Sequence, residues 1–322
     1  MQSGPVIVSL LNIRLPPMFR PASPEARLIG SIGNGFLLAA TAIALLVIFL
    51  TVWITRRYGQ SRRPGEPSQA PAGRWLEIPM IGGPLLIVIA FFFWSMRAMN
   101  AVLPEREGRA ADVVITGHQW FWEVSYPTSG VVTANEVHLP VGKRLLLELN
   151  SADVIHDWWV PALGAKMDMI PGRSNHLWLT VQDSGNYLGA CSEFCGQQHA
   201  WMRIRVIVQP EREFQQWLAA QSAPAPAPQD KLAESGRSLF LTATCSNCHR
   251  VKGTAATGRE GPDLTHLASR QTLLAGRTDN DSASLYRWLM DPQKLKPGAR
   301  MPKFHLPKDS IKALVAWLTH LK

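Results

Sequence analysis

The sequence contains little cysteine. Its 322 residues contain only four, in two close pairs, Cys191/Cys195 and Cys245/Cys248. Small disulfide-held folds need more cysteines in a shorter chain, so that class is excluded, and close pairs are typical of cofactor attachment. The chain also lacks a concentrated basic patch, although its formal net charge is +9. This spread of charge argues against nucleic acid as a partner.

The net charge is divided unevenly along the chain. It is +6 over residues 1–100, −4 over 101–229 and +7 over 230–322. A Pro- and Ala-rich stretch precedes the last region, and such a composition favours an extended, semi-rigid linker. We therefore expect five parts: an N-terminal segment 1–27 whose processing the sequence leaves open, a membrane hairpin 28–100, a β domain 101–218, a linker 219–229 and an α domain 230–322.

Two long stretches lack charged residues. The first runs from Leu28 to Thr55 and the second from Ile78 to Met96. About 20 apolar residues cross the hydrocarbon core of a membrane as a helix, so we expect spans at about 31–55 and 77–97. Arginines in the loop between them mark the cytoplasmic side, which places the N-terminus and everything after residue 97 outside the cytoplasm. These arginines are Arg56, Arg57, Arg62, Arg63 and Arg74.

The region from 110 to 210 has the pattern of a β domain. Short runs of β-branched, aromatic and alternating residues are separated by Gly, Pro and Asn breaks, which favours a Greek-key sandwich or barrel. The predicted strands are Val113–Thr116, Trp120–Ser125, Leu145–Asn150, His176–Gln182 and Arg203–Gln209.

A metal constellation lies within this region. Cys191, Cys195, His199 and Met202 fall in twelve residues, and a second imidazole, His156, lies upstream. Soft sulfur donors with imidazole and a weak Met ligand are the pattern of copper electron-transfer sites. Two cysteines can bridge two metal ions while one histidine terminates each. A Cys191–Cys195 disulfide and a structural zinc site are the alternatives, but neither uses the Met202 thioether.

These residues resemble the dinuclear copper (CuA) signature of cytochrome c oxidase subunit II. The segments Gly117–Trp122 and Lys166–Arg173 also match, and the resemblance covers about residues 30–218. It implies a cupredoxin-like β-barrel behind a two-helix transmembrane hairpin. The copper ligands that it implies are His156, Cys191, Cys195, His199, Met202 and the backbone carbonyl of Glu193.

The resemblance also implies roles for three other groups. The Glu193 carboxylate would face a magnesium ion shared with subunit I, and Trp120 would be the surface aromatic through which electrons enter. Glu77 resembles the acid at the mouth of a proton channel in the partner subunit. The family usually has Trp three residues after that acid, whereas this chain has Met80. The alternative for Glu77 is a helix-end carboxylate that reaches toward water.

Beyond the linker, Cys245-Ser246-Asn247-Cys248-His249 has the spacing of a covalent haem c site. The two thiols reach the haem vinyl groups and His249 binds the iron. Gly261–Leu264 and Arg300–Phe304 resemble class I cytochrome c, an all-α domain, which makes Met301 the expected sixth ligand. Met290 competes, but its helical pattern indicates a core residue, and His266 and His305 are expected to be surface residues. Two helices are predicted, Asp230–Thr242 and Lys308–Leu321.

Together these features predict the subunit through which electrons enter a caa-type haem-copper oxidase of the bacterial inner membrane. The resemblance implies membrane lipid, subunits I and III and an external donor, a cytochrome c or a cytochrome bc complex, as partners, with oxygen reduced to water and protons pumped. The uncharged spans hold no histidine, so the oxygen-reducing site belongs to another subunit. The alternatives are a copper-bearing small subunit of a nitric oxide reductase and a stand-alone membrane-anchored electron carrier.

Overall fold

The computed structural model describes residues 16–59, 73–103 and 108–322. The described residues form two compact units, one of residues 27–103 and one that combines 16–26 with 108–322. Most of the predicted N-terminal segment lies outside the described residues, as do Arg62 and Arg63 of the predicted cytoplasmic loop.

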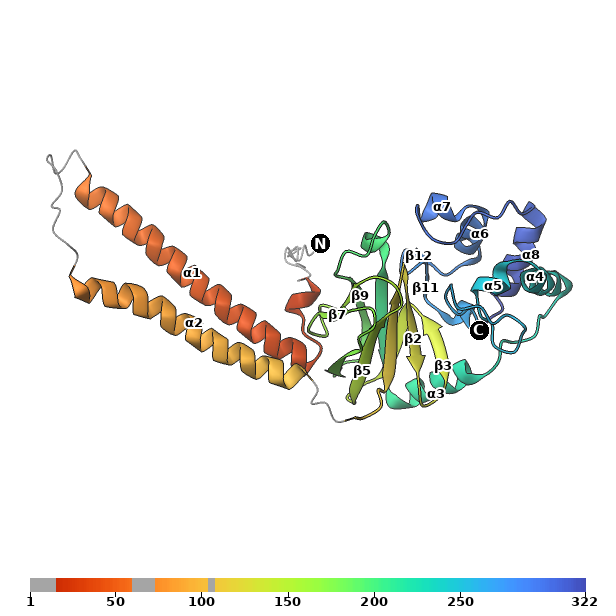
Figure 1. Ribbon diagram of the computed structural model, residues 1–322, viewed down its shortest axis with the longest axis horizontal. Helices are drawn as coiled ribbons and strands as arrows, with labels where there is room; N and C mark the ends of the chain where they lie inside the picture. Colours follow the sequence, from red (N-terminus) through yellow and green to blue (C-terminus); the bar gives the residue numbers. More distant parts are fainter. Residues whose placement is uncertain (1–15, 60–72, 104–107) are drawn as a thin grey trace, which may run out of the picture. The chain divides into compact units, whose positions relative to one another are not determined.

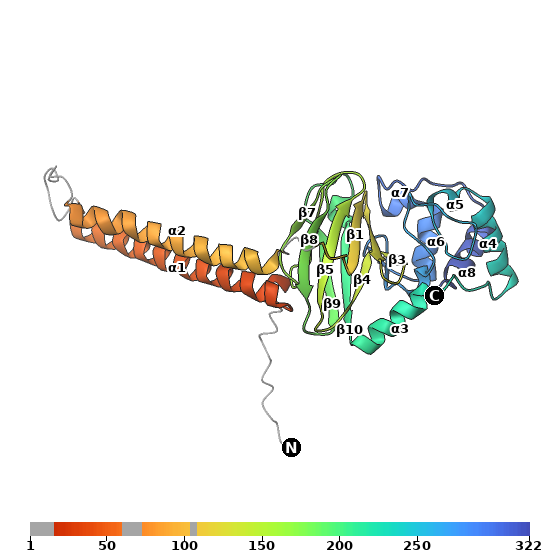
Figure 2. The ribbon, with the colours of Figure 1, turned by 60° about the horizontal axis from the view of Figure 1, so that its bottom comes forward.

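The first unit is a helical hairpin. Helices α1 (Pro24–Tyr58) and α2 (Arg74–Val102) run side by side (Figures 1 and 2). They approach closely at Gly35, where an added Cβ would lie 2.7 Å from the Trp94 ring. Both helices are long and apolar enough to cross a membrane. This agrees with the two predicted spans, and α2 continues through its two prolines, Pro79 and Pro84.

The second unit begins with a sandwich of two five-stranded sheets. One sheet has the strand order β3-β2-β1-β5-β8 and the other β4-β10-β9-β6-β7. Parallel pairing of β1 with β5 and of β4 with β10 gives the mixed, cupredoxin-like arrangement. The strands are β1 (Val113–His118), β2 (Phe121–Tyr126), β3 (Val131–Ala134), β4 (Glu136–Pro140), β5 (Arg144–Ser151), β6 (His156–Trp159), β7 (Met167–Met169), β8 (Asn175–Thr180), β9 (Gly185–Cys191) and β10 (Arg203–Gln209).

The core of the sandwich follows from the alternation of side chains along its strands. In β1 and β5 every second side chain points inward, and Ile115, Leu147 and Leu149 have no exposed surface. Trp122 of β2 is equally buried and meets Trp158 of β6 edge-to-face, with ring centroids 6.5 Å apart. This contact ties the two sheets together beside the start of β6, where His156 lies.

The C-terminal part is an all-α domain, as the class I cytochrome c resemblance implied. Its helices are α4 (Lys231–Thr242), α5 (Cys245–Cys248), α6 (Ser282–Met290), α7 (Pro292–Leu295) and α8 (Lys308–Leu318), with a short β11 (Thr272–Leu273) and β12 (Thr278–Asp279). Asp230 caps α4 by accepting a hydrogen bond from Ala233 N. Helices α4 and α8 cross at Gly236, where an added Cβ would lie 1.9 Å from Ala313 O.

The linker differs from the sequence prediction. Its first four residues, 219–222, belong to a helix that the sequence did not predict, α3 (Glu211–Ser222). The next residues lie on the α domain: Ala225 N donates to Lys252 O at 2.9 Å, and the Lys252 ammonium donates to Ser222 O at 2.6 Å. The connection is therefore held against the C-terminal domain and does not run free for its whole length.

Candidate copper and haem sites

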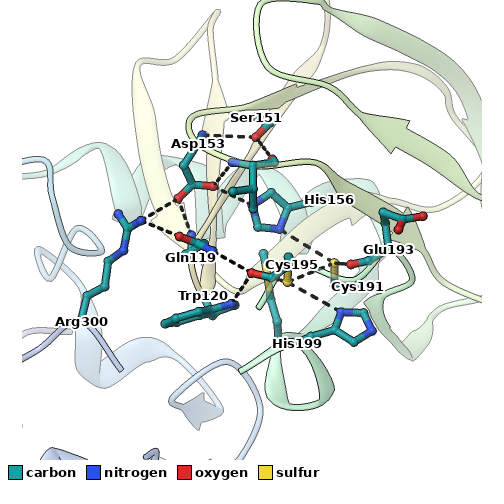
Figure 3. Close-up of polar contacts among 12 residues, drawn as sticks. Gln119, Trp120, Ser151, Asp153, His156, Cys191, Glu193, Cys195, His199 and Arg300 are labelled. Atoms are coloured by element: carbon teal, nitrogen blue, oxygen red, sulfur yellow. Dashed lines mark hydrogen bonds and ion pairs between the residues drawn. The ribbon is translucent and has the colours of Figure 1, made fainter. Parts of the chain in front are cut away.

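Five sulfur and imidazole side chains converge at one end of the β sandwich. His156 begins β6 and Cys191 ends β9, while Cys195, His199 and Met202 lie in the loop that leads into β10 (Figure 3). Cys191 Sγ is 3.8 Å from both Cys195 Sγ and His156 Nδ1. Cys195 Sγ is 3.6 Å from His199 Nδ1 and 3.8 Å from Met202 Sδ. The side chains predicted as copper ligands are thus brought together.

Backbone geometry positions these donors. Gly196 has a φ of +109°, a left-handed conformation that favours glycine in the ligand loop. Gly117 of β1 leaves room for the His156 ring, since an added Cβ would lie 2.7 Å from the ring carbon Cδ2. Cys191 N donates to Met202 O at 2.9 Å, which closes the loop. Any side chain at Gly117 would displace the imidazole.

The donor set fits copper better than the alternatives. The Sγ atoms of Cys191 and Cys195 are 3.8 Å apart and both thiols are free, whereas a disulfide requires about 2 Å. A tetrahedral zinc site would leave the fully buried Met202 thioether unused. The Glu193 carbonyl oxygen, 3.2 Å from Cys191 Sγ, completes a set of soft and borderline donors that suits copper.

Hydrogen bonds within the site shift the pKa values of two proposed ligands, Cys191 and His156. The pKa of the Cys191 thiol is lowered, chiefly by its hydrogen bond with Cys195, so this pair holds a thiolate, the form that binds metal. Burial lowers the pKa of His156, but its hydrogen bonds to Cys191 and Asp153 outweigh that effect, and the net shift is upward.

Residues around the ligands hold them in place, and sequence reasoning missed two of these. Asp153 Oδ1 lies 2.9 Å from His156 Nε2, and Gln119 Nε2 donates to Cys195 O at 2.8 Å. The Trp120 indole N–H donates to the same carbonyl, also at 2.8 Å. The signals available in the sequence were the position of Asp153 three residues before His156 and that of Gln119 beside Trp120.

Three acidic residues lie in or beside the copper loop, the segment of residues 191–202: Glu193 belongs to it, Asp157 O accepts from Ser192 N at 3.1 Å, and Asp168 pairs with Asp157. Glu193 and Asp168 are exposed, and Asp157, paired with Asp168 across β6 and β7, is buried. Burial raises the pKa of Asp157 to about 7, with a further contribution from a hydrogen bond with Asp168. In the described residues these carboxylates do not form a closed metal cluster with Glu193. A magnesium ion would therefore need further ligands from a partner.

The haem attachment motif lines a cavity of about 440 Å³ whose wall is formed mostly by the α domain and partly by the β domain. Cys245, Cys248 and His249 lie on one part of its wall and Met301 on another. The His249 Nδ1–H donates to Pro262 O at 2.8 Å, which leaves Nε2 for an iron ion. The arrangement fits a haem bound by two thioethers and two axial ligands.

Two buried cations support the fit to haem. Arg270 and Lys296 line the cavity and are 8% and 5% exposed. In the described part of the chain the Arg270 Nε has no hydrogen-bond partner, and the printed partners of the Lys296 ammonium are neutral backbone carbonyls, Trp120 O at 2.9 Å and Leu274 O at 3.5 Å. Burial, together with Arg277, lowers the pKa of Lys296 to about 8. A haem brings two carboxylates, which are suitable counter-ions for such cations.

The competing iron ligands do not reach this cavity. Met290 packs against the core of the α domain, as predicted. His266 does not line the cavity, but the prediction that it is a surface residue was wrong: it is 4% exposed, and its Nε2 lies 3.1 Å from Ala223 O of the linker. His305 also lies away from the cavity wall.

Trp120 differs from its predicted position. It is only partly exposed, and with Gln119 and Phe121 it lines the haem cavity from the side of the β domain. The same side chain touches the carbonyl of Cys195. Trp120 therefore lies between the two candidate cofactor sites and not on a free surface.

Comparison with known proteins agrees with this two-site arrangement. A family model, cytochrome c oxidase subunit II periplasmic domain, matches residues 129–209, and a cytochrome c model matches residues 233–322. Cytochrome c oxidase subunit 2 of Alkalihalophilus pseudofirmus is 33% identical and covers 94% of this chain and 90% of its own length. The chain belongs to the cytochrome c oxidase subunit 2 family.

Other members are similar over parts of the chain. Cytochrome c oxidase subunit 2 of Bacillus sp. strain PS3 is 31% identical and covers 81% of this chain and 79% of its own. The solved periplasmic domain of subunit II of cytochrome oxidase of Bradyrhizobium japonicum is 35% identical over 35% of this chain and 95% of that one, with a TM-score of 0.33. As an oxidase subunit 2 with a C-terminal cytochrome c domain, the chain is part of a haem-copper oxidase complex.

Proposed function

We propose that this subunit 2 receives electrons from an external donor at haem c, passes them singly to a dinuclear copper centre and so supplies the haem of subunit I. Oxygen would be reduced to water there, with proton pumping. One observation carries the proposal: Trp120 lines the haem cavity and donates a hydrogen bond to the carbonyl of the copper-site residue Cys195.

The residues of the two sites have distinct roles in this proposal. Cys191 and Cys195 would bridge two copper ions, and the other copper ligands would be His156, His199, Met202 and the Glu193 carbonyl. Cys245 and Cys248 would hold the haem, with His249 and Met301 on its iron. When bound, these groups supply carriers that accept and release one electron at a time.

The protein around the copper ligands would keep their geometry constant. His156 and Met202 have no exposed surface and Cys195 is 2% exposed, so water is excluded from these three donors, while His199 is half-buried. A closed, rigid ligand shell changes little when one electron is added, which suits electron transfer and leaves no open position for a substrate. This supports a carrier role for the chain itself.

The outer face of the copper loop would bind subunit I. Phe194 is 75% exposed and follows directly after Glu193, so this loop presents an apolar side chain beside a carboxylate. Glu193 would contribute its carboxylate to a shared magnesium ion, and Asp168 and Arg173 are exposed on the same domain. The same complex would include subunit III and accept electrons from a cytochrome c or a cytochrome bc complex.

The helical hairpin would anchor the subunit in the bacterial inner membrane, surrounded by lipid, with the domains after α2 on the periplasmic side. Arg56 and Arg57 lie in the last turn of α1 and support a cytoplasmic loop. Glu77 lies in the first turn of α2 and would be near the cytoplasmic membrane surface, where a proton channel of subunit I could begin.

Spectroscopy and kinetics on the purified oxidase test this proposal. Electron paramagnetic resonance should show mixed-valence copper, optical spectra should show haem c, and gas consumption should show oxygen use. After rapid reduction of haem c, Trp120→Leu should slow the appearance of reduced copper about tenfold, equivalent to roughly 1.4 kcal/mol of activation free energy. Consumption of nitric oxide in place of oxygen, or purification of the chain without partners, would favour the alternatives.

A further inference from the structure

Arg300 reaches from the haem domain to the copper domain. It precedes Met301, the proposed haem ligand, and its side chain is 57% exposed. Its guanidinium donates to Gln119 Oε1 at 2.6 Å and lies 3.7 Å from Asp153 Oδ2 (Figure 3). One side chain of the C-terminal domain therefore contacts two side chains of the β sandwich.

Both contacted residues hold a copper ligand. Asp153 uses its other oxygen, Oδ1, to bind His156 Nε2 at 2.9 Å, while Gln119 Nε2 donates to Cys195 O at 2.8 Å. Asp153 and Gln119 also contact each other, since Gln119 N donates to Asp153 Oδ2 at 2.7 Å. Figure 3 shows Arg300 at the end of this network opposite the sulfur atoms.

The charges in this network act on the copper ligands in opposite directions. A carboxylate bonded to a metal-bound imidazole increases the basicity of that imidazole and so favours the more oxidised metal. A guanidinium beside the carboxylate offsets part of this effect and favours the reduced metal. Because the Asp153 side chain is only 16% exposed, water screens its charge less than that of an ordinary surface pair.

We propose that Arg300 is a positioning residue through which the docked haem domain adjusts the copper centre. It holds Asp153 and Gln119, and through them His156 and Cys195, and it raises the reduction potential of the copper pair. The inference rests on the proposed function. Copper would accept an electron more readily when the haem domain is docked than when it is displaced, and by linkage copper reduction would favour docking.

The test is a redox titration of the purified oxidase in which copper and haem c are followed by separate absorption bands. Arg300→Gln should lower the equilibrium constant for reduction of copper about threefold, which lowers its reduction potential by about 28 mV for a one-electron couple. The copper hyperfine pattern in electron paramagnetic resonance should change with it. Arg300→Lys should restore part of the shift, because it keeps the charge but its shorter side chain replaces the single Nη2 atom that contacts both Gln119 and Asp153.

A matched control and a double variant separate a specific effect from general damage. Arg237→Gln in α4 removes the same charge from the haem domain, and we expect wild-type copper behaviour. In an Asp153→Asn background, Arg300→Gln should shift the copper reduction potential by at most half as much as in the wild type, since residue 153 no longer carries a charge.

Several outcomes would overturn the inference. These are an unchanged copper potential in Arg300→Gln, an equal shift in Arg237→Gln, an equal shift with and without Asp153, or a shift confined to haem c. Failure of the proposed function is distinguishable, because the wild-type oxidase would then lack the mixed-valence copper signal or the haem c band before any variant is compared.

Discussion

The Glu136 carboxylate of β4 accepts a hydrogen bond from the backbone N–H of Thr272 in the haem domain, at an Oε1 to N distance of 2.9 Å. Gln271 N donates to the same carboxylate at 2.9 and 3.1 Å, and Thr272 Oγ1 at 3.2 Å. Glu136 is 1% exposed. A buried carboxylate that is satisfied by another domain's backbone is a specific docking contact and not a general attraction between opposite net charges.

Substituting Glu136 should therefore loosen the haem domain. In Glu136→Gln the amide NH2 would face backbone donors, and a buried unmatched donor costs about 1–3 kcal/mol. We expect electron transfer from haem c to copper to slow about tenfold and to fall further as ionic strength rises, because docking would then depend on long-range charge alone. Transient absorption at several salt concentrations measures this.

Glu148→Gln is the matched control. Glu148 lies in β5 of the same sandwich, and its side chain bonds only within that sandwich in the described residues, to Asn150, Ser174 and His176. In Glu148→Gln the rate of electron transfer from haem c to copper, and the dependence of that rate on salt, should equal those of the wild type. If Glu136→Gln also behaves like the wild type, the buried contact does not determine docking.

His138 should make the β sandwich sensitive to acid. Its ring stacks on Trp217 with centroids 3.9 Å apart, and Nδ1 lies 2.8 Å from Gln209 Oε1. Burial lowers the pKa of His138 to about 4, although the Gln209 hydrogen bond opposes this. The unfolded chain binds this proton more readily than the folded chain. The contribution of His138 to the free energy of unfolding is therefore fully present above about pH 6.5 and is lost as the pH falls toward 4, with a loss of about 2 kcal/mol at pH 5.

Thermal melting of the full-length chain in detergent between pH 4 and 7 measures this effect. His138→Phe should melt at a temperature that depends less on pH over that range than the wild type. His176→Gln alters a histidine that is about one-third exposed in β8 and should keep the wild-type slope. Parallel pH profiles for wild type and His138→Phe would show that this proton is not responsible.

Most of the proposed ligands could be picked out from sequence because cofactor chemistry demands fixed local spacing, whereas His156 and Met301 lie far from the other ligands in the sequence and were assigned by resemblance. Cys191 to Met202 and Cys245 to His249 are each a single short segment, so their donor types and spacing are visible without a fold. The five predicted strands are present, but the short strands β3, β4, β6 and β7 and the glycine-containing β9 were missed, since few residues carry their pattern. Helix α3 was missed because its Ala- and Gln-containing end merges with the Pro-rich linker.

Long-range relations could not be predicted in this way. Arg300 and Gln119 are 181 residues apart in sequence, and Glu136 and Thr272 are 136 apart. Nothing in the local pattern of a strand residue such as Glu136 distinguishes a docking carboxylate from a solvated one. The placement of Trp120 against the haem cavity likewise depends on how two separately folded regions meet.

If Cys191 and Cys195 bridge two copper ions as proposed, loss of one thiol should abolish the paired copper signal while leaving haem c intact. Two thiolates are needed to bridge a pair of copper ions, and Cys191→Ser leaves only that of Cys195. We therefore expect at most one copper ion per chain and no mixed-valence spectrum. Electron paramagnetic resonance and metal analysis measure this, and Ser192→Ala is the neighbouring control. A retained two-copper spectrum in Cys191→Ser would contradict the ligand assignment.

The crossing of α4 and α8 should tolerate no side chain at Gly236. An added Cβ would lie 1.9 Å from Ala313 O, a backbone atom that moves only if the helices separate. Such overpacking costs about 1–3 kcal/mol or more, and Phe240 and Trp317, with ring centroids 4.8 Å apart, would lose contact as well. We expect Gly236→Ala to lower the melting temperature of the haem domain, followed by its haem absorption. Ser235→Ala changes an exposed residue of the same helix and should melt like the wild type. A wild-type melting temperature for Gly236→Ala would show that the two helices separate at little cost in free energy.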